Sequence, residues 1–227
     1  MTNLVIEVWG ILDDSPYVRR AMSHGLINTR ALARYIIRER KIDATIDAVI
    51  SAIRRYELGR CDRIFEDAHR MMAQIIAIST KSPLADISLI KDIEIQKLLP
   101  QLFSVIHYNQ GAVLRVIQTD ESIKILVDEK NREEVKTLFP ESKIIRIDRN
   151  LAEINIHQHP DAKNTPGTLA IMSNELAING INILEAMSCI SELLWFVEEK
   201  DLLRAYNILN RFWQLNQKLY HKDDQAT

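Results

Sequence analysis

The sequence contains little cysteine, glycine and proline, and these shortages narrow what the chain can be. Its 227 residues include two cysteines, Cys61 and Cys189, and six residues each of glycine and proline. Two cysteines this far apart form neither a disulfide framework nor a metal or redox spacing, and such sparse use is typical of a reducing compartment. We therefore expect a cytoplasmic protein without a thiolate metal centre.

The sequence also lacks long apolar stretches. No run approaches the ~18 apolar residues that a membrane-spanning helix requires. The segment that follows Met1 has no basic region and no long apolar core, so we predict no signal peptide. Both absences predict a protein that has no membrane partner.

Motifs of enzymes and of common cofactor sites are missing as well. We find no Walker loop, no glycine-rich dinucleotide turn, and no Ser-His-Asp or Cys-His spacing that falls on one site. His157 and His159 lie near Asp161, but this set offers no fourth ligand for a closed zinc site, so we interpret both as ordinary loop histidines. We expect no catalytic residues, no cofactor and no metal, and hence a protein that is not an enzyme.

Charge is nearly balanced over the whole chain but is uneven along it. The 29 basic and 31 acidic residues give a net charge of −2, which implies no global attraction to nucleic acid. Residues 1–60 nevertheless hold ten basic against seven acidic residues, a net charge of +3, which leaves −5 for the remainder. The first 60 residues are therefore where an anionic partner would bind.

The same 60 residues read as a bundle of short helices. Ser15-Pro16 restarts the chain after a first helix, Asn28 or Thr29 caps a third helix, and Asp43 caps a fourth helix from Ala44 to Tyr56. Bundles of this kind include helix-turn-helix modules, whose cations neutralise DNA phosphates. The candidate nucleic-acid-binding residues are Arg30, Arg34, Arg38, Lys41, Arg54 and Arg55. Against this, the turn at 40–43 is long for such a motif, and arginines four residues apart are ordinary on a solvent-facing helix.

Residues 61–82 predict a connecting helix, and beyond it strands and helices alternate twice. The first copy, 83–149, predicts strand 84–91, helix 93–106, strands 112–119 and 122–128, helix 131–139 and strand 143–148. The second copy, 150–227, predicts strand 151–157, helix 166–179, strands 181–189 and 192–198, helix 201–213 and a polar tail that extends it. This order predicts an α+β fold with two ferredoxin-like βαββαβ units. The second copy lacks a final strand, which the first copy or a partner chain could supply.

One loop of the second copy carries the binding hypothesis. His159 to Leu169 leaves a strand and enters a helix, with Asn164 or Thr165 as the expected N-cap and Pro166 at the first helical position. Gly167 leaves the backbone N–H groups open, and such a helix start binds a carboxylate through those groups and the helix dipole. Lys163 and Asn164 add a cation and an amide beside it.

This loop, together with Gly180-Ile181-Asn182-Ile183 after the helix, resembles the ACT domain, most closely the regulatory ACT units of aspartokinase-like proteins. The resemblance covers residues 151–213 well and 84–148 by element order alone. The chain is similar to archaeal tandem-ACT proteins with a short N-terminal helical segment, which are predicted regulators of amino-acid metabolism. It implies that an amino acid binds between two ACT units, at Asp161, Asn164, Thr165, Pro166 and Gly167 of the loop and at Ile181 and Asn182. The first copy has only Lys91-Asp92-Ile93 at the equivalent place, so we interpret it as a structural mate.

Two classes of function remain open. In the first, the chain is a ligand-responsive transcription regulator, with the N-terminal helices on DNA and a small amino acid bound by paired ACT units, in a homodimer. In the second, it is a regulatory or scaffolding subunit that binds no DNA and docks on a metabolic enzyme. The sequence names neither the amino acid nor the regulated gene or enzyme.

Overall fold

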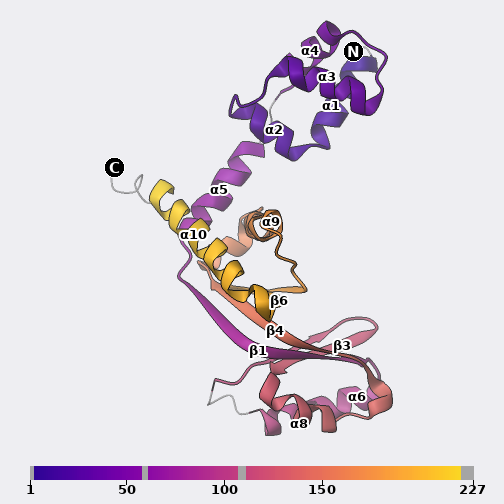
Figure 1. Ribbon diagram of the computed structural model, residues 1–227, viewed down its shortest axis with the longest axis vertical. Coiled ribbons are helices and arrows are strands. Elements are labelled where there is room, and N and C mark those ends of the chain that lie inside the picture. Colours follow the sequence, from indigo (N-terminus) through magenta and orange to yellow (C-terminus); the bar gives the residue numbers. More distant parts are fainter. Residues whose placement is uncertain (1–2, 58–60, 107–110, 221–227) are drawn as a thin grey trace. The chain divides into compact units, whose positions relative to one another are not determined.

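The computed structural model describes residues 3–57, 61–106 and 111–220, which form two compact units (Figure 1). The first unit is Met1–Asp67 and the second is Ala68–Thr227. Helix α5 (Cys61–Ala73) spans the boundary between them. Among the described helices, none is both long and apolar enough to cross a membrane.

The first unit begins with four short helices around one apolar core. They are α1 (Asn3–Asp13), α2 (Pro16–Ser23), α3 (Thr29–Arg40) and α4 (Ile46–Arg54). Asn28 caps α3 as expected, because its side chain accepts hydrogen bonds from the backbone N–H groups of Arg30 and Ala31. The expected cap at Asp43 is wrong, since Thr45 accepts the bond from Ala48 N and α4 begins at Ile46. The core consists of Val5, Val8, Leu12, Leu32, Ala33, Ile36, Ile42, Val49, Ala52 and Ile53.

The second unit contains the predicted alternation of strands and helices, with shifted ends. Its strands are β1 (Ala77–Ile90), β2 (Leu114–Gln118), β3 (Ser122–Asp128), β4 (Ile144–His157), β5 (Glu185–Cys189) and β6 (Glu192–Glu198). Its main helices are α6 (Ile93–Leu98), α7 (Leu102–Val105), α8 (Arg132–Thr137), α9 (Thr168–Ile178) and α10 (Leu202–Tyr220). The connecting helix is shorter than expected, because α5 ends at Ala73 and residues 77–82 belong to a strand. Helix α10 extends into the polar tail, as expected.

All six strands form one antiparallel sheet in the order β2-β3-β1-β4-β6-β5. Strands β1 and β4 are 14 residues long and take part in both repeats. We call β2, β3, residues 84–90 of β1 and residues 144–148 of β4 the first half-sheet. Residues 77–81 of β1, residues 151–157 of β4, β6 and β5 form the second half-sheet. The strand missing from the second repeat is thus the start of β1.

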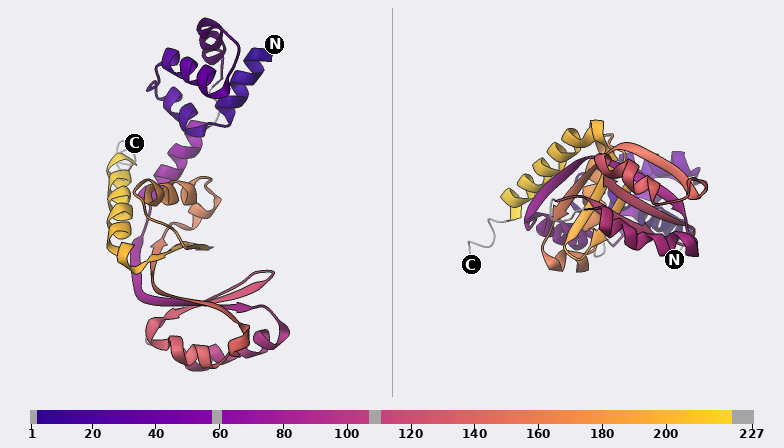
Figure 2. Two further views of the ribbon diagram at one scale, coloured as in Figure 1. Left: turned by 45° about the vertical axis from the view of Figure 1, so that its right-hand side comes forward. Right: turned by 90° about the horizontal axis from the view of Figure 1, so that it is seen from below.

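The two predicted units are therefore joined through shared strands, and each half-sheet has the strand order of a ferredoxin-like fold. The β1–β4 register shifts between Lys81 and Leu84 and again between Leu84 and Asp86, and Asn150 adopts a left-handed conformation with φ of 57°. Figure 2 shows both strands bending where they pass from one half-sheet to the other. Irregular pairing of this kind bends a strand, so the sheet curls instead of lying flat.

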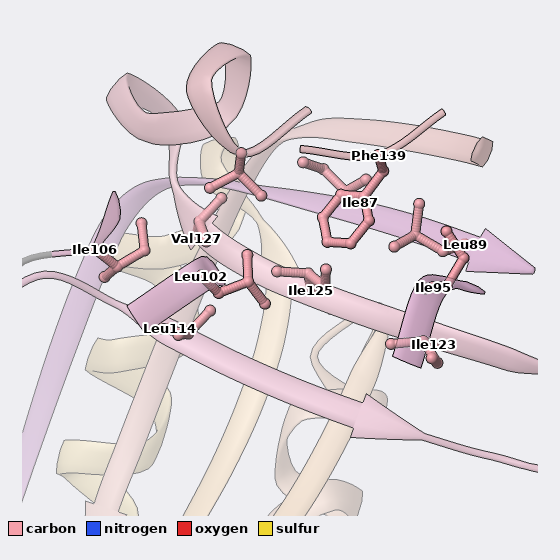
Figure 3. Packing of buried hydrophobic residues seen from close by; sticks show 11 residues of the cluster. Ile87, Leu89, Ile95, Leu102, Ile106, Leu114, Ile123, Ile125, Val127 and Phe139 are labelled. Carbon is pink, nitrogen blue, oxygen red and sulfur yellow. The ribbon is translucent and has the colours of Figure 1, made fainter. Parts of the chain in front are cut away.

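Each half-sheet is covered by its own helices. In the first half-sheet, side chains of β1 and β3 such as Ile87, Leu89 and Ile125 pack against Ile95 and Leu102 of α6 and α7 (Figure 3). In the second half-sheet, α10 packs on α9 and β4. A further apolar cluster joins the two half-sheets and consists of Leu84, Val113, Leu126, Leu151, Leu194 and Phe196. Side chains near this cluster build the cleft described below.

Candidate functional site

The expected binding loop follows β4 and has a different local structure from the one predicted. Residues Pro160–Asn164 form a 3-10 turn, and α9 begins at Thr168. The N-cap is Gly167, with φ of 92° and no side-chain cap, so the prediction of Asn164 or Thr165 as N-cap and Pro166 as first helical residue is wrong. A left-handed residue there favours glycine because it has no Cβ. As at any helix start, the first backbone N–H groups of α9 have no acceptor within the helix itself.

Most polar groups of the loop are open to solvent. Asp161, Lys163, Asn164 and Pro166 are exposed, whereas Thr165 and Gly167 are partly buried. The loop is held internally: Thr165 Oγ1 donates to the carbonyl of Asp161 at 3.3 Å, and Asp161 N donates to His159 Nδ1 at 3.3 Å. The loop therefore presents an ordered start of α9 together with an amide and a cation.

Ile181 and Asn182 lie at the other end of α9. Ile181 is buried, and its N–H donates to the carbonyl of Leu176, whereas Asn182 is exposed. Helix α9 has 11 residues, so its ends are separated by about 16 Å at 1.5 Å per residue. One chain therefore does not bring the two predicted parts of the site within reach of one small ligand.

The two loop histidines have separate acidic neighbours. His157 Nε2 lies 3.3 Å from Glu192 Oε1, and His159 Nδ1 lies 3.4 Å from Asp161 Oδ2. Within residues 3–57, 61–106 and 111–220, no group of three or more His, Cys, Asp or Glu side chains is arranged to hold a metal ion.

All six candidate nucleic-acid-binding residues in the first unit are exposed. Arg30, Arg34 and Arg38 recur every four residues and so share one side of α3. Two of them have acidic neighbours, because Arg30 Nη1 lies 3.8 Å from Asp47 and Arg38 Nε lies 2.9 Å from Glu39. Lys41 ends α3 in a left-handed conformation, and Arg54 and Arg55 are at the end of α4. Acidic neighbours weaken the positive potential of this surface.

The sequence did not indicate a cleft that lies where the first half-sheet meets the start of β5. The cleft has a volume of about 300 Å³. Its apolar wall is formed by Leu151, Leu184 and Phe196, and the rest is lined by the charged residues Asp86, Lys124, Arg146, Asp148, Arg149, Glu185 and Glu198. These residues come from β1, β3, β4, β6 and the chain entering β5, so no local motif marks them. Its volume is at the lower limit of sites for small metabolites.

Lys124 is the central cation of this cleft. Its Nζ lies 3.3 Å from Asp86 Oδ2 and also contacts the carboxylate of Glu185. The side chain of Asp86 is only 3% exposed. Burial raises the pKa of the Asp86 carboxyl above its ordinary value, and the Lys124 ammonium offsets part of that effect. Two carboxylates thus share one ammonium group in the wall of the cleft.

Of the two arginines at the rim of the cleft, Arg146 is bound more loosely. Arg146 Nε lies 2.6 Å from Asp148 Oδ2, and the Arg146 side chain is 65% exposed. Arg149 is also more than half exposed, but its Nε and Nη2 both contact Oε1 of Glu129, at 2.8 and 2.7 Å, and the Glu129 side chain is only 18% exposed. Exposed ion pairs contribute little to stability, typically about 0–1 kcal/mol, so the Arg146 guanidinium can change partner at little cost, whereas Arg149 is held by a largely buried carboxylate.

A second buried charge, Glu153, lies on β4 and pairs with Arg115 of β2. The side chain of Glu153 is 1% exposed, and Arg115 Nη2 donates to its Oε1 at 3.0 Å. Burial raises the pKa of the Glu153 carboxyl, while the Arg115 guanidinium lowers it in part. This pair joins β2 to β4 across the curled sheet, and we interpret it as a structural contact.

Comparison with known proteins places the fold. No protein-family model matches the sequence, and no curated protein matches it. The regulatory subunit of aspartate kinase from Thermus thermophilus, in a ligand-free form, matches with a TM-score of 0.50 and 16% identity over 61% of this chain and 97% of that chain. The regulatory subunit of aspartate kinase from Thermus flavus matches with a TM-score of 0.50 and 15% identity over 62% of this chain and 99% of that chain.

A longer protein also matches. Aspartate kinase from Clostridium acetobutylicum aligns with a TM-score of 0.48 and 18% identity over 61% of this chain, but the chain spans only 34% of that enzyme's length. The two regulatory subunits are covered almost completely, and the 61% and 62% of this chain that match them share their ACT-like α+β fold.

Proposed function

We propose that this protein is a non-catalytic regulator that senses an amino acid through its ACT-like unit. The fold shared with two aspartate kinase regulatory subunits supports a regulatory role. The open start of α9 beside Lys163 and Asn164 supports a ligand that carries a carboxylate. Asn182 and the backbone at Ile181 would contact the remainder of the ligand.

The separation of about 16 Å between the two ends of α9 is the observation that supports a site shared between two chains. A single small ligand spans this distance only if the loop and the Ile181–Asn182 segment come from different chains. We therefore propose a homodimer in which the loop of one protomer meets the Ile181–Asn182 segment of its partner. Exposed Asn164 and Asn182 are available for such a contact.

A thermal-denaturation screen over the twenty amino acids tests the ligand. An amino acid at a hundred times its Kd stabilises the folded state by about 2.7 kcal/mol. We expect one or a few amino acids to raise the melting temperature, and sedimentation velocity to report a dimer with that ligand. If none of the twenty raises the melting temperature, this proposal is wrong.

Mixing two variants tests whether the site is shared between chains. Asn164→Ala and Asn182→Ala should each abolish binding in their own homodimers. A mixed dimer has one site with both native asparagines and one site with neither, so an equimolar mixture should regain binding. Asn207→Ala, which removes an exposed asparagine from α10, is the matched control. Binding that survives in either single variant would refute the shared site.

A second candidate function is nucleic-acid binding by the first unit. The exposed arginine row of α3 favours it, because Arg30, Arg34 and Arg38 project from one side of a helix. Retardation of generic duplex DNA at about 50 mM salt, lost at about 200 mM, is the expected result. If DNA is not retarded at low salt, the first unit does not bind DNA. Docking of this unit on a metabolic enzyme would then be the remaining role.

A further inference from the structure

The cleft lined by Lys124 offers acidic, basic and apolar groups to one small ligand. We infer that it is a second ligand site, complete within one chain, for the zwitterion of an aliphatic amino acid. The inference shares with the proposed function the premise that this unit senses an amino acid. It assigns the ligand to a different set of residues, which a single protomer supplies. No residue of the Pro160–Asn164 turn lines this cleft.

The acidic wall of the cleft fits the ligand's ammonium group. Asp86 and Glu185 both contact the one ammonium of Lys124, so this cluster carries one negative charge in excess. Asp86 is almost fully buried, and an uncompensated charge there is costly. An incoming ammonium group brings three N–H donors and neutralises the excess. The side chain of Glu185 is 30% exposed, so the ligand can approach its carboxylate from solvent.

The basic rim of the cleft fits the ligand's carboxylate. Arg146 is exposed, and its present partner Asp148 is two residues away on the same strand. A guanidinium group binds a carboxylate through two parallel N–H···O bonds, which are stronger than a neutral hydrogen bond. Arg149 lies on the same strand and also lines the cleft, but its guanidinium binds Glu129, so Arg146 is the group that receives the carboxylate. A carboxylate at Arg146 would release Asp148 to solvent, at the small cost of an exposed ion pair.

The remaining wall selects the side chain and the size of the ligand. Leu151 and Phe196 are buried members of the apolar cluster between the half-sheets, and Leu184 borders them at the start of β5. An aliphatic side chain covers this wall and binds there through the burial of its CH₂ groups. A volume of about 300 Å³ admits a ligand of amino-acid size and is too small for a nucleotide.

Fragments of one amino acid test this assignment group by group. The probes are L-leucine, 4-methylpentanoate, which lacks the amine, and isopentylamine, which lacks the carboxylate. Isothermal titration of the full chain should give one L-leucine per protomer and an affinity at least tenfold above that of either fragment. Glu185→Gln should weaken L-leucine and isopentylamine about tenfold and spare 4-methylpentanoate. Arg146→Gln should weaken L-leucine and 4-methylpentanoate about tenfold and spare the amine.

Control variants separate this site from the loop site. Glu141→Gln and Arg211→Gln remove exposed charges outside the cleft and should leave all affinities unchanged. Asn164→Ala and Asn182→Ala remove residues of the loop site, so they discriminate between the two sites: L-leucine that binds in the cleft keeps its affinity in both variants. Unaltered melting temperatures of the variants would exclude misfolding as a cause of lost binding.

The outcomes distinguish the two proposals. If L-leucine binding is lost in Asn164→Ala or Asn182→Ala but not in Glu185→Gln or Arg146→Gln, the inference is wrong and the loop site stands. If L-leucine, L-isoleucine and L-valine show no binding at about 10 mM, which is ten times a Kd of about 1 mM, the inference is also wrong. The proposed function is then decided by its own screen of all twenty amino acids. If neither the two cleft variants nor the two loop variants change the binding of L-leucine, the assignment of the ligand to the cleft is wrong as well.

Discussion

Replacing Lys124 by Met should destabilise the Ala68–Thr227 unit, because the buried carboxylate of Asp86 loses its ammonium partner. Removing one partner of a fully buried ion pair costs about 3–5 kcal/mol. Here Asp86 is 3% exposed, but the side chains of Lys124 and Glu185 are 23% and 30% exposed. Water can therefore hydrate Glu185 after the change, and only Asp86 is left without compensation. We expect a loss of about 2–3 kcal/mol in the free energy of unfolding at pH 7.

The size of this loss should depend on pH and on Asp86. The folded-state pKa of Asp86 is already raised by burial, and removing the Lys124 ammonium raises it further, so Asp86 takes up a proton more readily as pH falls. The destabilisation by Lys124→Met should shrink as pH falls below 7, because protonation of Asp86 removes the uncompensated charge. Adding Asp86→Asn to Lys124→Met should recover most of the lost stability at pH 7, because position 86 then carries no buried charge.

Urea unfolding followed by tryptophan fluorescence measures this effect in the correct unit. The chain has three tryptophans, and in a Trp9→Phe background only Trp195 and Trp213 remain, both in the Ala68–Thr227 unit. A loss below about 1 kcal/mol for Lys124→Met at pH 7 would refute the reasoning. So would a double variant no more stable than Lys124→Met alone.

Three further predictions concern the buried carboxylate of Glu153, the apolar cluster between the half-sheets and the N-cap of α4. Burial raises the pKa of Glu153, so its contribution to stability is greatest below its ordinary pKa of 4.5 and is lost as pH rises through the folded-state pKa. Glu153→Gln should remove this decline in the free energy of unfolding with rising pH. An unchanged pH profile would contradict this prediction. Phe196→Ala should cost about 3–5 kcal/mol, whereas Phe103→Ala, at a side chain 63% exposed, should cost far less; equal costs would be contrary to the packing described. Thr45→Ala should destabilise the first unit by about 1 kcal/mol, as followed by Trp9 fluorescence, while Asp43→Ala should be nearly neutral; the reverse order would restore Asp43 as the cap.

The order of elements in the second unit was predictable, but the start of β1 was not. Residues 85–89 alternate between apolar and polar side chains, which marks a strand from sequence alone. Residues 77–81 follow Ile75 and Ile76, whose spacing continues the helical pattern of α5. They form a strand because they pair with residues 153–157 of β4, a distant segment whose pairing overrides local preference. Local periodicity does not contain that information.

Caps were predictable only as a choice among neighbouring residues. For α3 the sequence offered Asn28 or Thr29, and the cap is Asn28; for α4, Asp43 and Thr45 are both favoured N-cap residues, and pattern alone does not choose between them. At α9 the sequence offered Asn164, Thr165 and Pro166, all typical of a helix start. The 3-10 turn that ends at Asn164 displaced the start of α9 to Thr168.

The cleft was beyond sequence reasoning for a geometric reason. Asp86, Lys124, Arg146 and Glu185 lie on different segments, and each looks like an ordinary charged residue on a strand. They share one space because the sheet curls, and the curl depends on register shifts that composition does not reveal. The loop was identifiable because its residues are consecutive. Sites made from dispersed side chains need the fold first.

The sharing of β1 and β4 has a consequence for how the chain is made. The second half-sheet needs residues 77–81 to pair with residues 153–157, more than 70 residues further along the chain. Closing so long a loop is slow relative to local contacts. During synthesis the start of β1 therefore leaves the ribosome long before its partner and has an unpaired edge in the meantime. Residues up to about 150 include all four strands of the first half-sheet, so a nascent chain of that length can already complete one repeat. The second repeat cannot fold from its own residues alone, and the two repeats acquire their structure in a fixed order.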